Sequence, residues 1–288
     1  MLSFVALGDS ITAGLGDGIS MGRDHHGAGE LAGRGWAARA ARSLRGDGTD
    51  GPYGNGVMFV NLSTTGATTA KVRREQLPAA LRLGPAVASL VAGANDVLRP
   101  RFDALAARQN LIWSIERLRA SGAVVLTATL PDPARLVWLP IGARGRLTAR
   151  VEAVNAAVSA AAAGDPGVVV VDLRAQAFMY EASSFDVDRI HPSRRGHQLM
   201  ARVFTEALRS AGVPVRALPV VPPELAPPGS LERARWLAGV GVPWLVGRAM
   251  TPLRRNVEAE RSYQGGTDRY GSQLRWGVVA RDGFHSLP

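Results

Sequence analysis

Short apolar runs recur along the first two thirds of the chain, and stretches with helical periodicity separate them. The runs are rich in valine, leucine and alanine and carry almost no charge, which is typical of strands buried on both faces of a parallel sheet. Strands that alternate with helices predict an α/β fold. The pattern predicts a first strand that begins at about Ser3. Four more strands are predicted over Val57–Leu62, Val87–Ala92, Val124–Thr129 and Val168–Leu173.

The segments between these runs predict the helices that would cover the sheet. One helical stretch follows the turn Ser63–Thr69 and ends by about Leu83. Pro78 is expected to kink or split this helix because proline lacks a backbone N–H. The remaining helices are predicted over Trp36–Leu44, Phe102–Ala120, Leu147–Ala163 and Arg194–Ser210.

The first strand ends in a sequence that carries candidate chemistry. Its apolar run stops at Gly8-Asp9-Ser10, which predicts a tight turn with the serine hydroxyl at the carboxyl end of a buried strand. Open α/β sheets place their binding and catalytic groups at this edge. A serine hydroxyl is hardly ionised at pH 7, so a nucleophilic role for Ser10 requires a base and an anion pocket elsewhere in the chain.

A candidate base follows the fifth strand. Asp188 and His191 are three residues apart, so a helical turn would place both on one side, with the carboxylate on one imidazole nitrogen and the other free for the serine proton. Pro192 would fix the exit from this turn. His197, on the following helix, has no such acid and is interpreted as a structural histidine.

Two glycine turns are candidates for the anion pocket. Gly66 would let a backbone N–H approach a reacting oxygen, and Gly93 would present the amide of Asn95 at the end of the third strand. Each turn also has a plainer interpretation, because capping turns favour glycine, asparagine and aspartate.

Two loops are candidates for substrate contact. The glycine-rich segment Leu15–Gly35 either covers the substrate or is simply mobile, and its adjacent His25 and His26 would diverge and so form a poor metal site. The loop Pro131–Gly145 is unusually apolar, and it either packs into the core or lines a pocket for an acyl or alcohol group.

These motifs together resemble the SGNH (GDSL-type) hydrolases, in the order Gly8-Asp9-Ser10, Gly66, Gly93-x-Asn95-Asp96 and Asp188-x-x-His191. The resemblance covers about residues 3–213. It implies a flavodoxin-like three-layer sandwich with five parallel strands in the order 2-1-3-4-5. It also implies Ser10 as nucleophile, His191 as base and acid, Asp188 as its partner, and Ser10, Gly66 and Asn95 as oxyanion donors. No cofactor is expected, and no metal either, because no cluster of ligand residues is visible in the sequence.

The resemblance has limits. Ile11 stands where the family name has leucine, and a Gly-x-Ser-x-Gly elbow, typical of ordinary α/β hydrolases, is absent. Substrate contacts are expected at Asp9, Trp138 and Leu139, but the substrate itself is not specified by these residues.

Composition excludes several other classes of protein. Of the 288 residues, 46% are hydrophobic and 20% are charged, a composition that suits a soluble domain with a large core. It has no cysteine, which excludes disulfides, thiolate catalysis and cysteine-based zinc sites. The net charge of +10 comes almost wholly from scattered arginines without a nucleic-acid-binding module, so no nucleic-acid partner is expected.

The end of the chain has a different composition. We expect the hydrolase domain over residues 1–213, a proline-rich linker over 214–230, and over 231–288 an extension with a helix at Leu231–Thr251 followed by a loosely ordered tail. Packing of this extension on the core is favoured over contact with a membrane surface, because Gly239, Gly241 and Pro243 interrupt its amphipathic pattern. With no long apolar run and no room for a signal peptide before the first strand, a cytoplasmic location is expected.

The sequence therefore predicts a serine hydrolase that cleaves a small-molecule carboxylic ester through an acyl-serine intermediate. One alternative is an acyltransferase that uses the same residues, and another is a non-catalytic binding or membrane-docking protein on the same fold.

Overall fold

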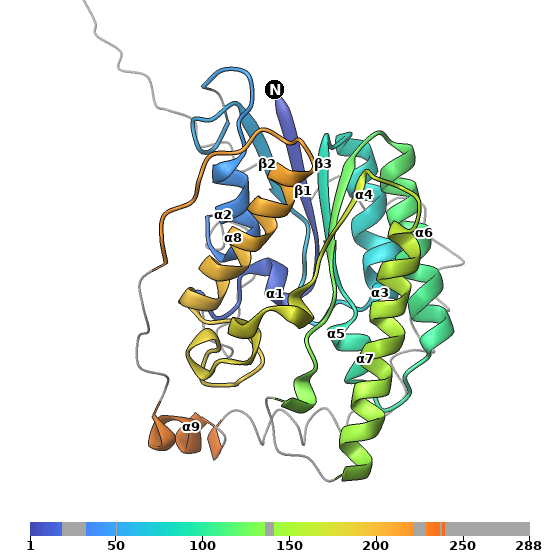
Figure 1. Ribbon diagram of the computed structural model, residues 1–288, viewed down its shortest axis with the longest axis vertical. Coiled ribbons are helices and arrows are strands. Elements are labelled where there is room, and N and C mark those ends of the chain that lie inside the picture. The colour runs from blue at the N-terminus through green and yellow to red at the C-terminus, as the bar shows by residue number, and fades with distance from the viewer. Residues whose placement is uncertain (19–32, 50, 136–140, 222–228, 237, 240–288) are drawn as a thin grey trace, which may run out of the picture.

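The structure, a computed structural model, describes residues 1–18, 33–49, 51–135, 141–221, 229–236 and 238–239. Five parallel strands form one sheet in the order β2-β1-β3-β4-β5, with helices on both faces (Figure 1). The strand order and the fold class confirm the prediction. The strands are β1 (Leu2–Gly8), β2 (Val57–Asn61), β3 (Val87–Val91), β4 (Val124–Ala128) and β5 (Val168–Val171).

The helices are α1 (Ser10–Ala13), α2 (Gly35–Ser43), α3 (Thr69–Lys71), α4 (Leu77–Leu83), α5 (Ala94–Val97), α6 (Ala104–Ala120), α7 (Ile141–Ala162), α8 (Arg194–Ser210) and α9 (Ser230–Trp236). The longer helices follow the predicted segments, whereas the short helices α1 and α5 lie where turns were predicted, and short 3₁₀ turns lie between β5 and α8. α8 has its predicted ends, and it starts at Arg194 because the Ser193 hydroxyl caps it, accepting a hydrogen bond from the Gly196 N–H at 3.2 Å.

Two helices differ from the prediction. α7 begins at Ile141 and not at Leu147, since the glycines at 142 and 145 weaken a helix without ending it. α3 and α4 are joined by a π-helical segment, Val72–Gln76, so the expected interruption lies just before Pro78.

The central strand β1 supplies both faces of the core. Phe4 and Ala6 point to one face, Val5 and Leu7 to the other, and all four are fully buried. This alternation follows from the pleat of a strand, and burial on both faces requires that every residue of the run be apolar.

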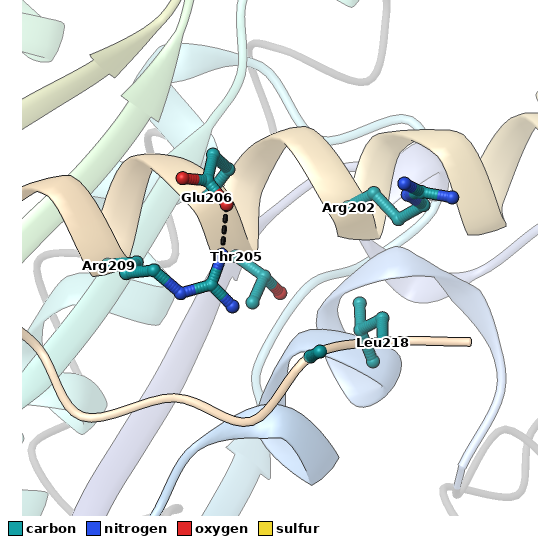
Figure 2. A pocket seen from close by; sticks show the side chains of 6 residues that line it. Arg202, Thr205, Glu206, Arg209 and Leu218 are labelled. Carbon is teal, nitrogen blue, oxygen red and sulfur yellow. Dashed lines mark hydrogen bonds and ion pairs between the residues drawn. The ribbon is translucent and has the colours of Figure 1, made fainter. Parts of the chain in front are cut away.

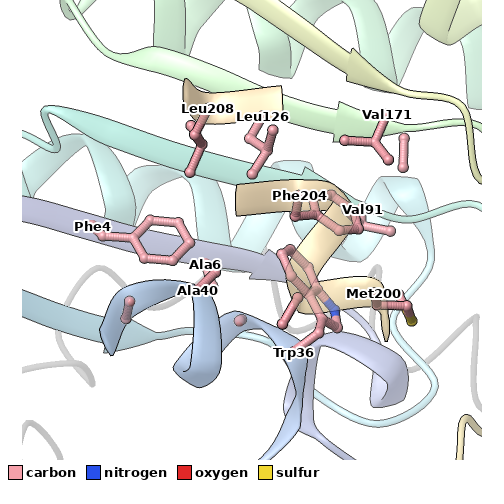
Figure 3. Close-up of a cluster of buried hydrophobic side chains, with 14 of the residues drawn as sticks. Phe4, Ala6, Trp36, Ala40, Val91, Leu126, Val171, Met200, Phe204 and Leu208 are labelled. Atoms are coloured by element: carbon pink, nitrogen blue, oxygen red, sulfur yellow. The ribbon is translucent and has the colours of Figure 1, made fainter. Parts of the chain in front are cut away.

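α2 and α8 cover the first face, and α3, α4, α6 and α7 cover the second (Figure 1). In the first layer, Trp36 stacks on Phe204 with ring centroids 4.0 Å apart, beneath the strands (Figure 3). Burial of a side chain such as Phe204 stabilises the fold by about 1.5–3 kcal/mol. The two helices are thereby fixed to the sheet and to each other.

The proline-rich stretch begins in contact with the sandwich. Val215 forms an antiparallel bridge with Leu44, and the Arg216 N–H donates to Ser43 O at 2.6 Å. α9 contains the start of the helix predicted over Leu231–Thr251, and residue 237 and residues 240–288 lie outside the described part. Among the described residues, no helix has both the length and the apolar character needed to cross a membrane.

Candidate active site

Ser10 stands at the carboxyl end of β1 as the first residue of α1. Asp9 caps this helix, because its Oδ1 accepts a hydrogen bond from the Ile11 N–H at 3.0 Å. Gly8 has a φ of 155°, and a Cβ there would lie 2.5 Å from Val91 O, so only glycine fits at this position. The turn therefore holds Ser10 close against the end of the sheet.

The chain brings His191 to Ser10 from a loop 181 residues further on. The imidazole Nε2 lies 2.8 Å from Ser10 Oγ, and Nδ1 lies 2.5 Å from Asp188 Oδ2. Ser10 is 7% exposed and His191 is 6% exposed. In this arrangement the imidazole can take the proton of Ser10 while the carboxylate stabilises the resulting positive charge.

The turn that carries Asp188 and His191 is not helical, and that part of the prediction is wrong. Arg189 has a φ of 59°, in the left-handed region. Asp188 Oδ1 accepts hydrogen bonds from the Ile190 N–H at 2.8 Å and the His191 N–H at 2.9 Å, so the carboxylate closes its own turn. Pro192 acts in the same direction, because a residue that precedes proline is disfavoured in the helical region and a helix would not continue through His191.

Backbone bonds fix this loop in place. The Asp186 N–H donates to His191 O at 2.9 Å, and Phe185 and Pro192 form an antiparallel bridge. The Ser193 N–H donates to Ser184 O at 2.9 Å immediately before α8. The orientation of the imidazole is therefore set by a closed loop and not only by its acid partner.

The ionisation of Asp188 is a balance of opposing effects. Burial favours the neutral carboxyl, but the hydrogen bond and charge of His191 and the two backbone N–H groups outweigh it, so the pKa of Asp188 is held below its usual value. The carboxylate is thus charged at neutral pH and can stabilise a protonated His191.

Asn95 connects the loops that follow three neighbouring strands. It lies in α5, directly after the β3 strand, and its Nδ2 is 3.3 Å from Asp9 Oδ2 and 3.1 Å from Ala67 O. Asp9 adjoins Ser10, and Ala67 adjoins Gly66. The structure therefore gathers the residues expected to form the anion pocket at one edge of the sheet.

Gly66 has a φ of 75°, in the turn between β2 and α3, where a residue with a side chain would be strained. A hydrogen-bond pair anchors the start of α3 after this turn. Asp96 accepts from the Thr69 N–H at 2.9 Å and from its hydroxyl at 2.7 Å. The two glycine turns of the sequence are thus linked by polar side chains that the strand pattern did not indicate.

Asp9 is a buried acid next to the proposed nucleophile. Burial raises its pKa to about 6, against the lowering effects of the Ile11 N–H and of His191. Its two carboxylate oxygens face Ile11 and Asn95. It therefore supports the turn and the Asn95 amide, and the expected contact of Asp9 with a substrate stays a prediction.

The remaining candidate residues are those of the two loops and His197. Trp138, Leu139, His25 and His26 are outside the described residues, so their expected roles stay predictions. His197 is fully buried. Its Nδ1 accepts a hydrogen bond from the Trp36 N–H at 3.2 Å, and its Nε2 donates one to Leu15 O at 2.9 Å. Both of its ring nitrogens thus contact backbone, as a structural histidine requires.

Two cavities on the α8 side contain none of the predicted site residues. One, of about 100 Å³, is lined by Arg202, Thr205, Glu206, Arg209, Ala217 and Leu218, and Figure 2 shows the Glu206–Arg209 ion pair in its wall. The other, of about 300 Å³, lies between α2, α8 and residues 216–220. Neither cavity includes Ser10 or His191.

Known proteins resemble this chain in sequence pattern and in fold. The model of the GDSL-like lipase/acylhydrolase family matches residues 6–199. The solved structure of TesA is 25% identical, with a TM-score of 0.50, and the match covers 73% of this chain and 99% of that chain. No curated protein sequence matches the chain.

Two further structures share the fold. The lipase/acylhydrolase from Enterococcus faecalis is 20% identical with a TM-score of 0.53, covering 76% of this chain and 100% of that one. An acetyl-xylooligosaccharide esterase from Geobacillus is 19% identical with a TM-score of 0.52, covering 73% of this chain and 94% of that one. At these identities the likeness concerns the fold alone.

Proposed function

The chain belongs to the GDSL-like lipase/acylhydrolase family and is a carboxylic ester hydrolase, and on that premise we propose that it works through an acyl intermediate on Ser10. The observation that carries the proposal is the 2.8 Å contact between His191 Nε2 and Ser10 Oγ, with Asp188 on the opposite ring nitrogen.

In the first step, Ser10 Oγ attacks the carbonyl carbon of the ester and His191 Nε2 takes the hydroxyl proton. The carbonyl π electrons move to the oxygen, which becomes an oxyanion. As the tetrahedral intermediate collapses, the bond to the alcohol oxygen breaks and His191 gives its proton to that oxygen. The alcohol leaves, and the acyl group stays on Ser10.

The oxyanion would be met by the Ser10 N–H, the Gly66 N–H and the Asn95 amide. In the structure the amide contacts Asp9 and Ala67, and the contact with Asp9 is the longer at 3.3 Å. We expect the Asn95 N–H now facing Asp9 to turn toward the oxyanion, because this contact is the longer of the two and the charge that develops on the oxyanion makes it a strong acceptor.

In the second step, His191 takes a proton from water, the hydroxide oxygen attacks the acyl carbon, and the proton returns to Ser10 Oγ as the carboxylic acid leaves. An alcohol in place of water would give acyl transfer by the same residues. Product analysis with an added alcohol acceptor separates the two reactions, because a transferase forms a new ester at the expense of free acid.

The partner that this function implies is a small-molecule ester. Contact of Trp138 and Leu139 with its acyl or alcohol group stays a prediction, as does the cytoplasmic location. A profile of kcat/KM over p-nitrophenyl esters from acetyl to dodecanoyl tests the contact, since an apolar pocket should favour the longer chains.

Covalent labelling tests the proposal directly. A fluorophosphonate should modify the purified protein at Ser10, as identified by peptide mass, and should not modify the Ser10→Ala variant. Wild-type protein that hydrolyses esters yet is labelled elsewhere would remove Ser10 as the nucleophile. Protein that neither reacts nor hydrolyses any ester would favour the non-catalytic alternative.

A further inference from the structure

The side chain of Gln76 contacts both backbone groups of Gly8, two residues before Ser10. Its Oε1 accepts from the Gly8 N–H at 2.8 Å, and its Nε2 donates to Gly8 O at 2.9 Å. Gln76 is only 3% exposed. A side-chain amide has the same donor and acceptor as a peptide group, so it pairs with Gly8 as one residue of a neighbouring strand would.

The need for this pairing arises from the sheet itself. β2 pairs with β1 only as far as Ala6, whose carbonyl accepts from the Leu62 N–H at 2.8 Å. Beyond that point β2 gives way to the Gly66 turn, and only a longer bond, from the Thr64 N–H to Gly8 O at 3.3 Å, comes from that chain. An unpaired backbone group at this depth would be costly, and Gln76 satisfies it.

Gln76 is a polar residue in an otherwise apolar helix face. It ends the π-helical segment, and its buried neighbours on that face are Val72, Leu77 and Ala80. These apolar residues pack on the sheet beside β1, on the side of α6 and α7 (Figure 1). π-helical turns frequently occur at functional sites, and here the segment delivers an amide to the strand that carries Ser10.

On the proposed function, which this inference presupposes, we infer that Gln76 is a positioning residue for the reaction. It contacts no reacting atom. It holds the Gly8 peptide, from which the chain enters the turn that places Ser10 Oγ at 2.8 Å from His191 Nε2. It thereby also sets the direction of the Ser10 N–H and the place of Asp9 against Asn95.

The chain contains a matched control for this residue. Asn155 Oδ1 accepts from the Leu130 N–H at 2.7 Å, and its Nδ2 donates to Leu130 O at 3.0 Å. Asn155 is 5% exposed, and Leu130 follows β4, where no proposed catalytic or oxyanion residue lies. The same chemistry is thus present at a strand end with and without the proposed nucleophile.

The test compares Gln76→Met with Asn155→Leu, each of which replaces an amide by an apolar side chain of similar shape. Both should lower the urea midpoint to a similar extent. Because a shift of about 1 Å at a reacting group can cost 10²-fold, kcat should fall by about tenfold to 10²-fold in Gln76→Met with KM nearly unchanged. In Asn155→Leu, kcat should stay close to that of the wild type.

The Gln76→Glu variant gives a second readout and does not require that Gln76→Met folds. A protonated carboxyl can both donate and accept as the amide does, whereas a carboxylate can only accept. The ratio of its kcat to that of the wild type should therefore rise as the pH is lowered. A flat ratio, or equal kcat in Gln76→Met and Asn155→Leu, would overturn the inference and leave Gln76 with a structural role.

Failure of this inference is distinguishable from failure of the proposed function. Labelling of wild-type Ser10 by the fluorophosphonate tests the function alone. With that labelling established, a slower labelling rate in Gln76→Met and an unchanged rate in Asn155→Leu support the positioning role. Equal rates in the two variants argue against it.

Discussion

Two buried histidines six positions apart in the sequence have opposite surroundings. His191 is held between two side chains, the hydroxyl of Ser10 and the carboxylate of Asp188. His197 is held between two backbone groups, the Trp36 N–H and Leu15 O. The first arrangement can pass a proton between groups that change charge, and the second cannot, because neither a peptide N–H nor a carbonyl gives up or takes a proton at neutral pH.

Charge separates the two sites further. Burial lowers the pKa of His197 to about 4, although Leu15 O and Asp17 act against it, so the imidazole is neutral at pH 7 with its single proton facing Leu15. The Asp17 carboxylate does not pair with the His197 ring. It accepts hydrogen bonds from the Gly35 N–H at 2.9 Å and from Arg39 at 2.7 Å. Burial alone therefore does not mark a catalytic histidine in this fold, and the identity of its partners does.

The largest effects should follow from substitutions at His191 and its partners. Ser10→Ala and His191→Ala should each lower kcat by on the order of 10⁴ or more. The loss of kcat in Asp188→Asn should be smaller than the larger of these two losses. Steady-state kinetics on a p-nitrophenyl ester measures this. Near-normal turnover by Ser10→Ala would show that another group attacks the ester.

The proposed oxyanion donor should have the next largest effect. Asn95→Ala should lower kcat by about 10² to 10³ with little change in KM, because the amide acts on a charge that develops in the transition state. The measurement is a comparison of kcat and KM with the wild type. A change confined to KM would mean that Asn95 binds the ground-state substrate instead.

At His197 the expected effect is on stability. His197→Phe leaves the Trp36 N–H and Leu15 O without their partner, at a cost of about 1–3 kcal/mol for each buried group. Because His197 contacts no reacting atom, kcat should stay within about tenfold of the wild type. Urea unfolding and kinetics on the same preparation test both parts, and a kcat loss as large as that of His191→Ala would erase the distinction between the two histidines.

The pH dependence of stability sharpens the comparison. The folded pKa of His197 is about 4 and its ordinary value is 6.5, so between these values the unfolded chain binds more protons at this group. Its contribution to stability is therefore complete above about pH 6.5 and is lost as the pH falls toward 4, with a slope of up to about 1.4 kcal/mol per pH unit.

His197→Gln keeps a donor and an acceptor but removes this titration. Its free energy of unfolding should fall less than that of the wild type between pH 6.5 and pH 4, as measured by urea titrations at several pH values. Asp9 acts with the opposite sign in both proteins, because its pKa is raised to about 6 and its contribution is lost as the pH rises. Parallel pH profiles for variant and wild type would contradict the low pKa of His197.

The smallest effect is expected from chelation. Both nitrogens of His191 contact protein groups, and both nitrogens of His197 do as well, so neither ring is available to a metal ion. Prolonged dialysis against EDTA should leave kcat unchanged. Loss of activity that an added divalent ion restores would reveal a metal requirement.

The strands, the longer helices and the polar residues at the strand ends could be predicted from the sequence pattern. The run Phe4–Leu7 is apolar at every position, which a strand buried on both faces requires. The start of α8 is marked in the sequence by the serine that caps it. Gly8, Gly66 and Gly93 adopt the positive φ values for which glycine is suited, so the turns after three strands could be located from sequence.

How these turns meet depends on the packing of the elements, which the sequence pattern does not specify. The turn expected to be helical at Asp188 and His191 is instead closed by the Asp188 carboxylate, with Arg189 in the left-handed region. The spacing of three residues does not distinguish the two conformations. The start of α7 at Ile141 was missed because the glycines at 142 and 145 weaken the helix without ending it.

The pairing of Gln76 with Gly8 was out of reach of sequence for a further reason. A polar residue on an apolar helix face is visible in the pattern, but its partner lies 68 positions away and is a backbone group, which every residue possesses. Local sequence fixes which groups are polar and where a strand ends. The packing of the elements determines which polar side chain reaches which strand end. It therefore also determines hydrogen bonds such as those between Gln76 and Gly8.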